Sequence, residues 1–112
     1  MNATVKNNFD SIERIIFEEG LRIQAIDIHK ELDLMLIILN TKAILRQSIS
    51  KYPALKNASQ AQLNSYELIS NGVGVHWNLL DEDLSLKGFL KNEIKRTVYN
   101  DDSHLSGKKI VA

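Results

Sequence analysis

Residues 72–90 read GVGVHWNLLDEDLSLKGFL, and this stretch decides the fold more than any other part of the chain. A short apolar segment with two glycines leads to the only tryptophan, and an acidic turn and the start of a helix follow. Val73, Val75 and Trp77 alternate with other residues, which predicts a strand that carries these three side chains on one face. We expect this strand to lie at the structural centre of a small domain, and nothing in it resembles an obvious active site.

Upstream of this strand, apolar residues recur with a period near two. This period predicts three short strands, at about residues 21–29, 32–39 and 43–49, joined as an antiparallel meander. With residues 73–77 as a fourth strand, the sequence predicts a small α+β domain. It would contain an antiparallel sheet of about four strands with helices packed on it.

Helical spacing predicts the elements around this sheet. A short amphipathic helix that includes Phe9 is capped by Asp10 or Ser11 and ends at Gly20, and a strand over residues 14–17 is the alternative. Pro53 breaks the strand pattern, and Ser59, with a glutamine three residues later, forms a capping box that starts a second helix. We expect this second helix to end at residues 71–72.

The last predicted helix begins at Ser85. Its expected inward positions are Leu86, Phe89, Leu90, Ile94 and Val98. The chain would therefore consist of an N-terminal helical extension (residues 1–19), a single α+β domain (20–98) and a C-terminal tail (99–112), which we expect to be mobile unless something binds it.

Composition excludes several classes of protein. The chain has 112 residues, a formal net charge of zero and no cysteine. A neutral chain of this length has one small core and does not bind DNA or anionic lipid by bulk charge. The lack of cysteine excludes disulfides, thiolate catalysis and cysteine-ligated zinc. No segment resembles a signal peptide or the roughly 20 apolar residues of a membrane span, so we expect a cytoplasmic protein that does not contact membranes.

Residues 34–39, LMLIIL, would form a middle strand that is apolar on both faces. Such a strand must be covered on both faces, and one layer of helices covers only one of them. We therefore expect the N-terminal helix or another protein chain to cover the second face. The candidate residues for a partner or dimer interface are Phe9, Ile16, Met35, Ile37 and Leu39.

Lys87, Lys91 and Lys95 recur at every fourth residue and so form one stripe on the predicted C-terminal helix. Such a stripe is most often only a solvated face. It is also a candidate docking surface for an acidic protein or for the backbone of a nucleic acid, whose binding would then depend on salt.

The most tempting catalytic group is His76 with Asp81, Glu82 and Asp83. A histidine and three carboxylates could bind a divalent metal or transfer protons. A structural interpretation is stronger, because carboxylates just before a helix accept hydrogen bonds from its free backbone N–H groups. No serine lies in a nucleophile motif. We therefore expect no enzymatic activity, no metal and no cofactor.

Gly72 and Gly74 form a G-x-G pattern. A phosphate-binding loop would place such glycines between a strand and the helix that follows it. Here they follow a predicted helix and lead into a strand, so the order is wrong. We interpret them as a helix stop and as a place where the backbone passes close to a neighbour, such as the Trp77 ring.

Over about residues 20–90 the sequence resembles the bacterial family known as domain of unknown function 2442. The matching positions are Tyr52, Pro53, Leu55, Ala58, Ser59, Gly72, Gly74, His76, Trp77, Asp81, Glu82, Asp83 and Ser85. Asn78 departs from the pattern, because proline commonly follows the tryptophan in the family. The resemblance implies a small α+β fold with no established catalytic activity. It also implies relatives encoded beside another small gene, in arrangements that resemble toxin–antitoxin or mobile-element modules.

These observations favour a non-catalytic accessory or regulatory module. We expect it to form a homodimer and to bind and modulate or scaffold a larger protein, such as a toxin or a nucleic-acid-targeting defence enzyme. Any contact with nucleic acid would then be made through that partner. The alternative is a DNA-binding, antitoxin-like repressor. A metal-dependent hydrolase that uses His76, Asp81 and Asp83 is the weakest hypothesis.

Overall fold

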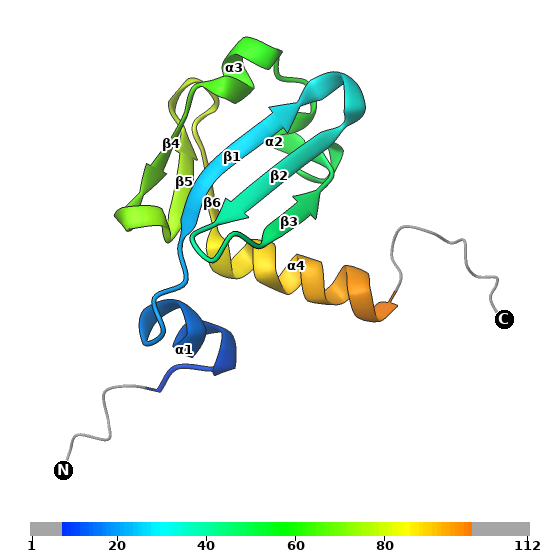
Figure 1. The fold of residues 1–112 in the computed structure, drawn as a ribbon. Coiled ribbons are helices and arrows are strands. Elements are labelled where there is room, and N and C mark those ends of the chain that lie inside the picture. Colours follow the sequence, from blue (N-terminus) through cyan, green and yellow to red (C-terminus); the bar gives the residue numbers. More distant parts are fainter. Residues whose placement is uncertain (1–7, 100–112) are drawn as a thin grey trace, which may run out of the picture.

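The computed structural model describes residues 8–99, which form two small antiparallel sheets with helices packed around them (Figure 1). The elements up to residue 56 are α1 (Ser11–Phe17), β1 (Ile23–His29), η2 (Lys30–Leu32), β2 (Leu34–Leu39), β3 (Ile44–Gln47), η3 (Ile49–Lys51) and α2 (Pro53–Lys56). The later elements are α3 (Gln60–Asn64), β4 (Tyr66–Ile69), η4 (Ser70–Gly72), β5 (Gly74–Trp77), η5 (Asn78–Leu80), β6 (Glu82–Ser85) and α4 (Leu86–Tyr99). The α+β class predicted from the sequence is confirmed. Residues 100–112, in the expected C-terminal tail, lie outside the described residues.

The first sheet is the predicted meander, with strand order β1-β2-β3. Its register places Asp27 opposite Leu36, and Leu36 opposite Arg46. The inward side chains of β2 are Met35, Ile37 and Leu39, all of which are buried. The first sheet therefore turns one face to the core and the other away from it.

The second sheet has the strand order β4-β5-β6, and two of its strands differ from expectation. Residues 66–69 form β4 instead of continuing a helix, and residues 82–85 form β6 instead of an acidic turn. The capping box of Ser59 and Gln62 is present, but α3 ends at Asn64. The physical reason lies at Leu63, whose carbonyl accepts a hydrogen bond from the Trp77 indole N–H at 2.8 Å. In a longer helix that carbonyl would accept from a residue of the next turn.

The expected fourth strand, β5, does not join the meander. It is the middle strand of the second sheet, and its Trp77 is fully buried in a core that also contains Phe89 and Leu86. Ser85 ends β6, and its Oγ accepts a hydrogen bond from the backbone N–H of Gly88 in the first turn of α4. The Trp77 strand and the last helix are therefore consecutive parts of one core.

Gly72 lies where the two sheets meet. It adopts φ +92°, and a Cβ atom built on it would lie 2.5 Å from the carbonyl oxygen of Ile23 at the start of β1. A close backbone neighbour was expected here, and that neighbour is β1, not the Trp77 ring. The helix stop expected at Gly72 is wrong, since the strand β4 precedes this turn.

Two ion pairs of Lys87 attach the N-terminal helix to the last helix. Lys87 Nζ lies 2.8 Å from Asp10 Oδ2 and 2.8 Å from Glu13 Oε2. Asp10 also caps α1 in a capping box with Glu13, and Ile16 of α1 is buried in the core. The extension thus packs on the domain through both charge and apolar contact.

Candidate interaction surface

The outer face of the first sheet is apolar. Leu34, Leu36 and Ile38 of β2 are partly exposed there, and Ile44 of β3 is 55% exposed. None of these four side chains packs against the hydrophobic core. In Figure 1, α2 lies behind this sheet, and no helix of residues 8–99 covers the side that faces the viewer. The centre of the outer face is therefore an apolar surface that the described part of the chain leaves open.

The strand register arranges this outer face in rows. One row contains Ala25, Ile38 and Ile44, all apolar. The next row contains Asp27, Leu36 and Arg46, which places an acidic group on one edge strand and a basic group on the other. The third row pairs Leu34 with His29, whose Nε2 lies 3.0 Å from Asp27 Oδ2. The apolar centre thus has one carboxylate, Asp27, on the β1 side and one guanidinium, Arg46, on the β3 side.

Four of the interface residues proposed from the sequence are in the wrong place for that role. Met35, Ile37 and Leu39 face the interior, where the chain's own elements seal them, and Ile16 is 1% exposed. The period of two correctly separated the two faces of β2, but it did not show which face the helices cover. Phe9 is partly exposed, and its ring stacks on that of Phe17 with the centroids 5.2 Å apart.

The three lysines of the stripe on α4 lie in two different environments. Lys91 and Lys95 are exposed, but Lys87 is held between Asp10 and Glu13. Hydrogen bonds to these two carboxylates raise the pKa of Lys87, and the same contacts lower the pKa of both carboxyl groups. Only two of the three lysines therefore present an uncompensated charge to a ligand.

His76 and Asp83 form a cross-strand pair on the outer face of the second sheet. His76 Nδ1 lies 2.6 Å from Asp83 Oδ1, and its Nε2 lies 3.4 Å from Asn78 Oδ1. The hydrogen bond to Asp83 is the main reason that the pKa of His76 is raised. Asp81 is set in a left-handed turn after η5. Within residues 8–99, no three histidine or carboxylate side chains come together as a metal site would require.

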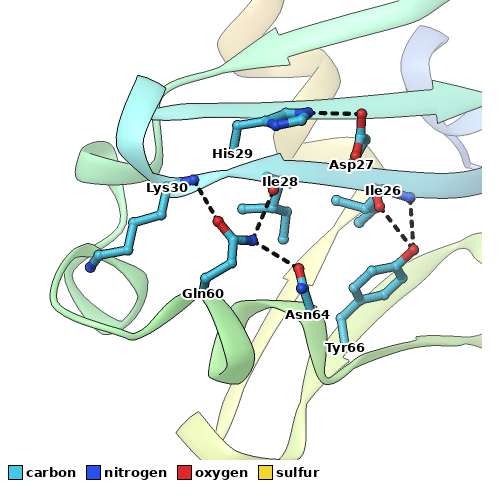
Figure 2. A network of polar contacts seen from close by, with 8 residues as sticks. All are labelled: Ile26, Asp27, Ile28, His29, Lys30, Gln60, Asn64 and Tyr66. Atoms are coloured by element: carbon cyan, nitrogen blue, oxygen red, sulfur yellow. Dashed lines mark hydrogen bonds and ion pairs between the residues drawn. The ribbon is translucent and has the colours of Figure 1, made fainter.

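At the free edge of β1, backbone N–H and C=O groups form hydrogen bonds with side chains from the second half of the chain (Figure 2). The Tyr66 hydroxyl accepts from the Ile26 N–H at 3.1 Å and donates to the Ile26 carbonyl at 2.9 Å. Gln60 donates to the Ile28 carbonyl and accepts from the Lys30 N–H, both at 2.9 Å. These contacts occupy hydrogen-bonding groups that another strand would need, so β1 is closed to further strand pairing. A partner of the first sheet therefore cannot add a strand beside β1.

Sequence reasoning missed these groups because the contacts join residues 32 and 40 positions apart. It also missed Asp27 and Arg46, whose importance depends on the register of three strands. The alternation of buried apolar and exposed residues in β1 and β3 could have shown that the Asp27 and Arg46 side chains lie on the side away from the core.

The geometry defines a class of protein: a small two-sheet α+β domain with one apolar outer face. No helix among residues 8–99 is long and apolar enough to cross a membrane. The chain belongs to the family described as Protein of unknown function (DUF2442), whose profile matches residues 23–95. The match begins at the start of β1, so α1 lies outside it.

Two solved structures are similar to this chain. A protein of unknown function from Rhodospirillum rubrum is 26% identical, with a TM-score of 0.59, over 65% of this chain and 88% of that one. An uncharacterised protein from Chromobacterium violaceum is 21% identical, with a TM-score of 0.60, over 88% of this chain and 96% of that one. The second likeness concerns the fold alone. No curated protein matches the chain.

Proposed function

We propose that this protein is a non-catalytic interaction module that forms a homodimer through the outer face of the β1-β2-β3 sheet. The observation that carries the proposal is the apolar surface of Leu34, Leu36, Ile38 and Ile44, which the described chain does not cover. A contiguous exposed apolar surface of this kind is typical of a binding site.

Charge complementarity favours a second copy of the chain as the occupant. A two-fold axis parallel to β2, placed between two such faces, would set β1 of one copy against β3 of the other. Because Asp27, Leu36 and Arg46 share one row, Leu36 would then face Leu36 of the second copy. Each Asp27 would face an Arg46. Such a self-complementary surface is what an isologous dimer requires.

The size of the face sets the expected affinity. Three strands of about six residues, with strands about 4.8 Å apart and about 3.3 Å per residue, span roughly 300 Å². A standard stable interface buries about 800 Å² on each partner. We therefore expect a reversible dimer with a dissociation constant in the micromolar range. The formal net charge of zero means that the two copies would not repel each other as whole molecules.

We further propose that the dimer binds and modulates or scaffolds a larger protein, such as a toxin or a nucleic-acid-targeting enzyme. Exposed apolar residues away from the sheet support a second contact surface. Ile94 and Val98, on the free half of α4, are 51% and 63% exposed, although inward positions were expected for both. The DNA-binding alternative has weaker support, because Lys87 is already paired with two carboxylates.

Light scattering coupled to size-exclusion chromatography tests the dimer. Between about 10 and 500 μM, the apparent mass of the wild-type chain should rise from that of a monomer towards that of a dimer. Leu36→Glu should remain monomeric, because it buries two facing charges. Ile69→Glu places the same change on the outer face of the second sheet and should dimerise normally. A monomeric wild type at the highest concentration, or a dimeric Leu36→Glu, would refute the proposal.

A further inference from the structure

An open pocket lies at the junction of the two sheets, where the start of β1 meets η4, and its volume is about 480 Å³. One water needs only about 15 Å³ of such space, so the pocket can hold a ligand of several heavy atoms. Its polar lining consists of Arg22, Gln24, Asn40 and Asn71, and its apolar lining includes Ile23 and Leu68. None of these residues is among those that we assign to the dimer surface.

Gly72 brings the two walls of this pocket together. It lines the pocket, and a Cβ atom built on it would lie 2.5 Å from the Ile23 carbonyl oxygen and 3.1 Å from the Arg22 Cβ. A larger residue would therefore push η4 away from the start of β1. The same turn holds Asn71 in the left-handed region, with φ 58° and ψ 37°, which asparagine tolerates better than most residues. Both residues thus serve to place the Asn71 amide in the same pocket as Arg22.

Arg22 carries the only charge among the described residues that line the pocket. Its Nη1 donates to the carbonyl groups of Ile16 and Leu21, and so one side of the guanidinium is used to satisfy the end of α1. The other side is free. Nε is buried and has no hydrogen-bond partner among residues 8–99, and Nη2 has no acceptor there but is not buried. A buried donor without an acceptor is costly, so an acceptor that reaches this side would be stabilising.

The geometry of a guanidinium decides which acceptor fits. Nε and Nη2 carry parallel N–H bonds along one edge, and the two oxygens of a carboxylate can accept from both at once. An oxygen that binds the accessible Nη2 of Arg22 lies beside Nε, so a small shift of the side chain lets the second oxygen satisfy the buried donor. The single positive charge suits a monoanion better than a phosphate group, which carries about 1.5 to 2 negative charges.

We propose that this pocket binds a carboxylate group, which belongs either to a small acid or to the end of a peptide. Arg22 binds the carboxylate through its free edge. The amides of Gln24 and Asn71 are exposed, and each can donate or accept a hydrogen bond with the rest of the ligand. The Asn40 amide has a structural role instead, because its Oδ1 accepts from the Arg22 N–H at 2.9 Å and its Nδ2 donates to the Gly20 carbonyl at 3.0 Å.

NMR titration of the full chain tests the site. N-acetylglycine and an uncharged-side-chain tripeptide with a free C-terminus are added separately at constant ionic strength, with N-acetylglycinamide as the uncharged reference. Saturable shifts with a dissociation constant of about 1 to 10 mM are expected at the Arg22 Nε–H signal and at the side-chain NH₂ signals of Gln24 and Asn71. Equal affinity for the two acids supports recognition of the carboxylate alone, and tighter binding of the tripeptide supports recognition of a peptide end.

Three results of this titration would overturn the proposal. The first is the absence of saturable shifts with both acids up to about 50 mM. The second is equal affinity for N-acetylglycinamide, which has no carboxylate. The third is tighter binding of inorganic phosphate than of either acid, because the pocket would then select a different anion.

Variants assign the binding to this pocket. Arg22→Lys keeps the positive charge but removes the forked donors, and it should weaken the binding of N-acetylglycine at least about fivefold. Arg14→Lys makes the same change at an exposed position of α1, outside the pocket lining, and should leave binding unchanged. Asn71→Asp retains a residue that tolerates the left-handed turn and adds a negative charge to the lining, so it should weaken binding at least about tenfold.

The amide spectrum of each variant shows directly whether it folds. Unchanged binding in both Arg22→Lys and Asn71→Asp would refute the assignment to this pocket. Equal weakening by Arg22→Lys and Arg14→Lys would refute it as well, because the effect would then follow from arginine content alone.

Discussion

The two sheets have the same topology, but their outer faces differ in polarity. Each is a three-stranded antiparallel meander that buries alternate side chains in a common core. The outer face of the first sheet carries leucine and isoleucine in its centre. The outer face of the second is mainly polar: it carries Glu67, His76, Asp83 and Ser85 along its three strands, with Ile69 at the end of β4 as its exposed apolar side chain. An antiparallel sheet with one polar face can expose that face to water without further cover. A sheet that is apolar on both faces is suited to binding a partner.

The junction between the sheets gives the largest expected effect. Gly72→Ala would place a methyl group 2.5 Å from the Ile23 carbonyl oxygen, at a positive φ that alanine rarely adopts. The sheets would have to move apart, and we expect a loss of about 3 kcal/mol or more in the free energy of unfolding. Urea denaturation followed by tryptophan fluorescence measures this loss, because the only tryptophan lies in the core.

Gly20→Ala is the matched control for this prediction. Gly20 also has a positive φ, of +84°, but an added Cβ would meet no atom within 4 Å. Only the backbone strain remains, and we expect a loss of about 1 kcal/mol. Equal losses in the two variants would show that the close approach of η4 to β1 does not hold the sheets together.

The second prediction concerns the side-chain link between the sheets. Tyr66→Phe removes both hydrogen bonds to Ile26 and leaves the exposed edge of β1 unpaired at that residue. We expect a loss of about 1–2 kcal/mol in the free energy of unfolding, together with faster hydrogen exchange at the Ile26 amide. Tyr99→Phe removes a hydroxyl from an exposed ring on α4 and should change neither quantity. Unchanged exchange at Ile26 in Tyr66→Phe would contradict this role.

The third prediction tests the opposite charges of Asp27 and Arg46 on the two edge strands of the first sheet. Asp27→Arg alone and Arg46→Asp alone should each weaken dimerisation about tenfold, because like charges would then face each other across the two-fold axis. The double variant restores opposite charges and should recover most of the affinity. Sedimentation equilibrium measures all four dissociation constants. If the double variant is as weak as the two single changes combined, the proposed pairing of β1 with β3 is wrong.

The sequence allowed the first sheet to be predicted more completely than the second. Strand β2 has an unbroken apolar run, and its neighbours follow after short turns, so the meander depends on local signals. In residues 60–72 the capping box indicates a helix, and Leu63, Tyr66 and Ile69 have helical spacing. Tertiary contacts decide the outcome there, because the Trp77 indole takes the Leu63 carbonyl and the Tyr66 hydroxyl binds β1.

The sequence predicted an apolar surface on β2 but assigned it to the face of the strand that is buried in the core. The run of residues 34–39 correctly indicated that both faces of β2 are apolar, yet the choice between Leu36 and Ile37 as the side that the core covers depends on where α2 and α4 pack. The cavity lined by Gln47 and Asn92 corresponds to no local pattern in the sequence. Its Gln47 and Asn92 are joined only through the Tyr52 hydroxyl, and residues 52 and 92 are 40 positions apart.

The smallest expected effect belongs to the polar face of the second sheet. The hydrogen bond to Asp83 raises the pKa of His76 above its ordinary value of 6.5 in the folded state. Protonated His76 therefore stabilises the fold at pH values below 6.5, and this contribution is lost as the pH rises through the folded-state pKa. The free energy of unfolding of the wild type should fall over this interval more steeply than that of His76→Gln. Asp83→Asn should flatten the profile in the same way, because it removes the acceptor that favours the charged ring. Parallel pH profiles for the wild type and both variants would show that the pair on this face is held by strand register alone.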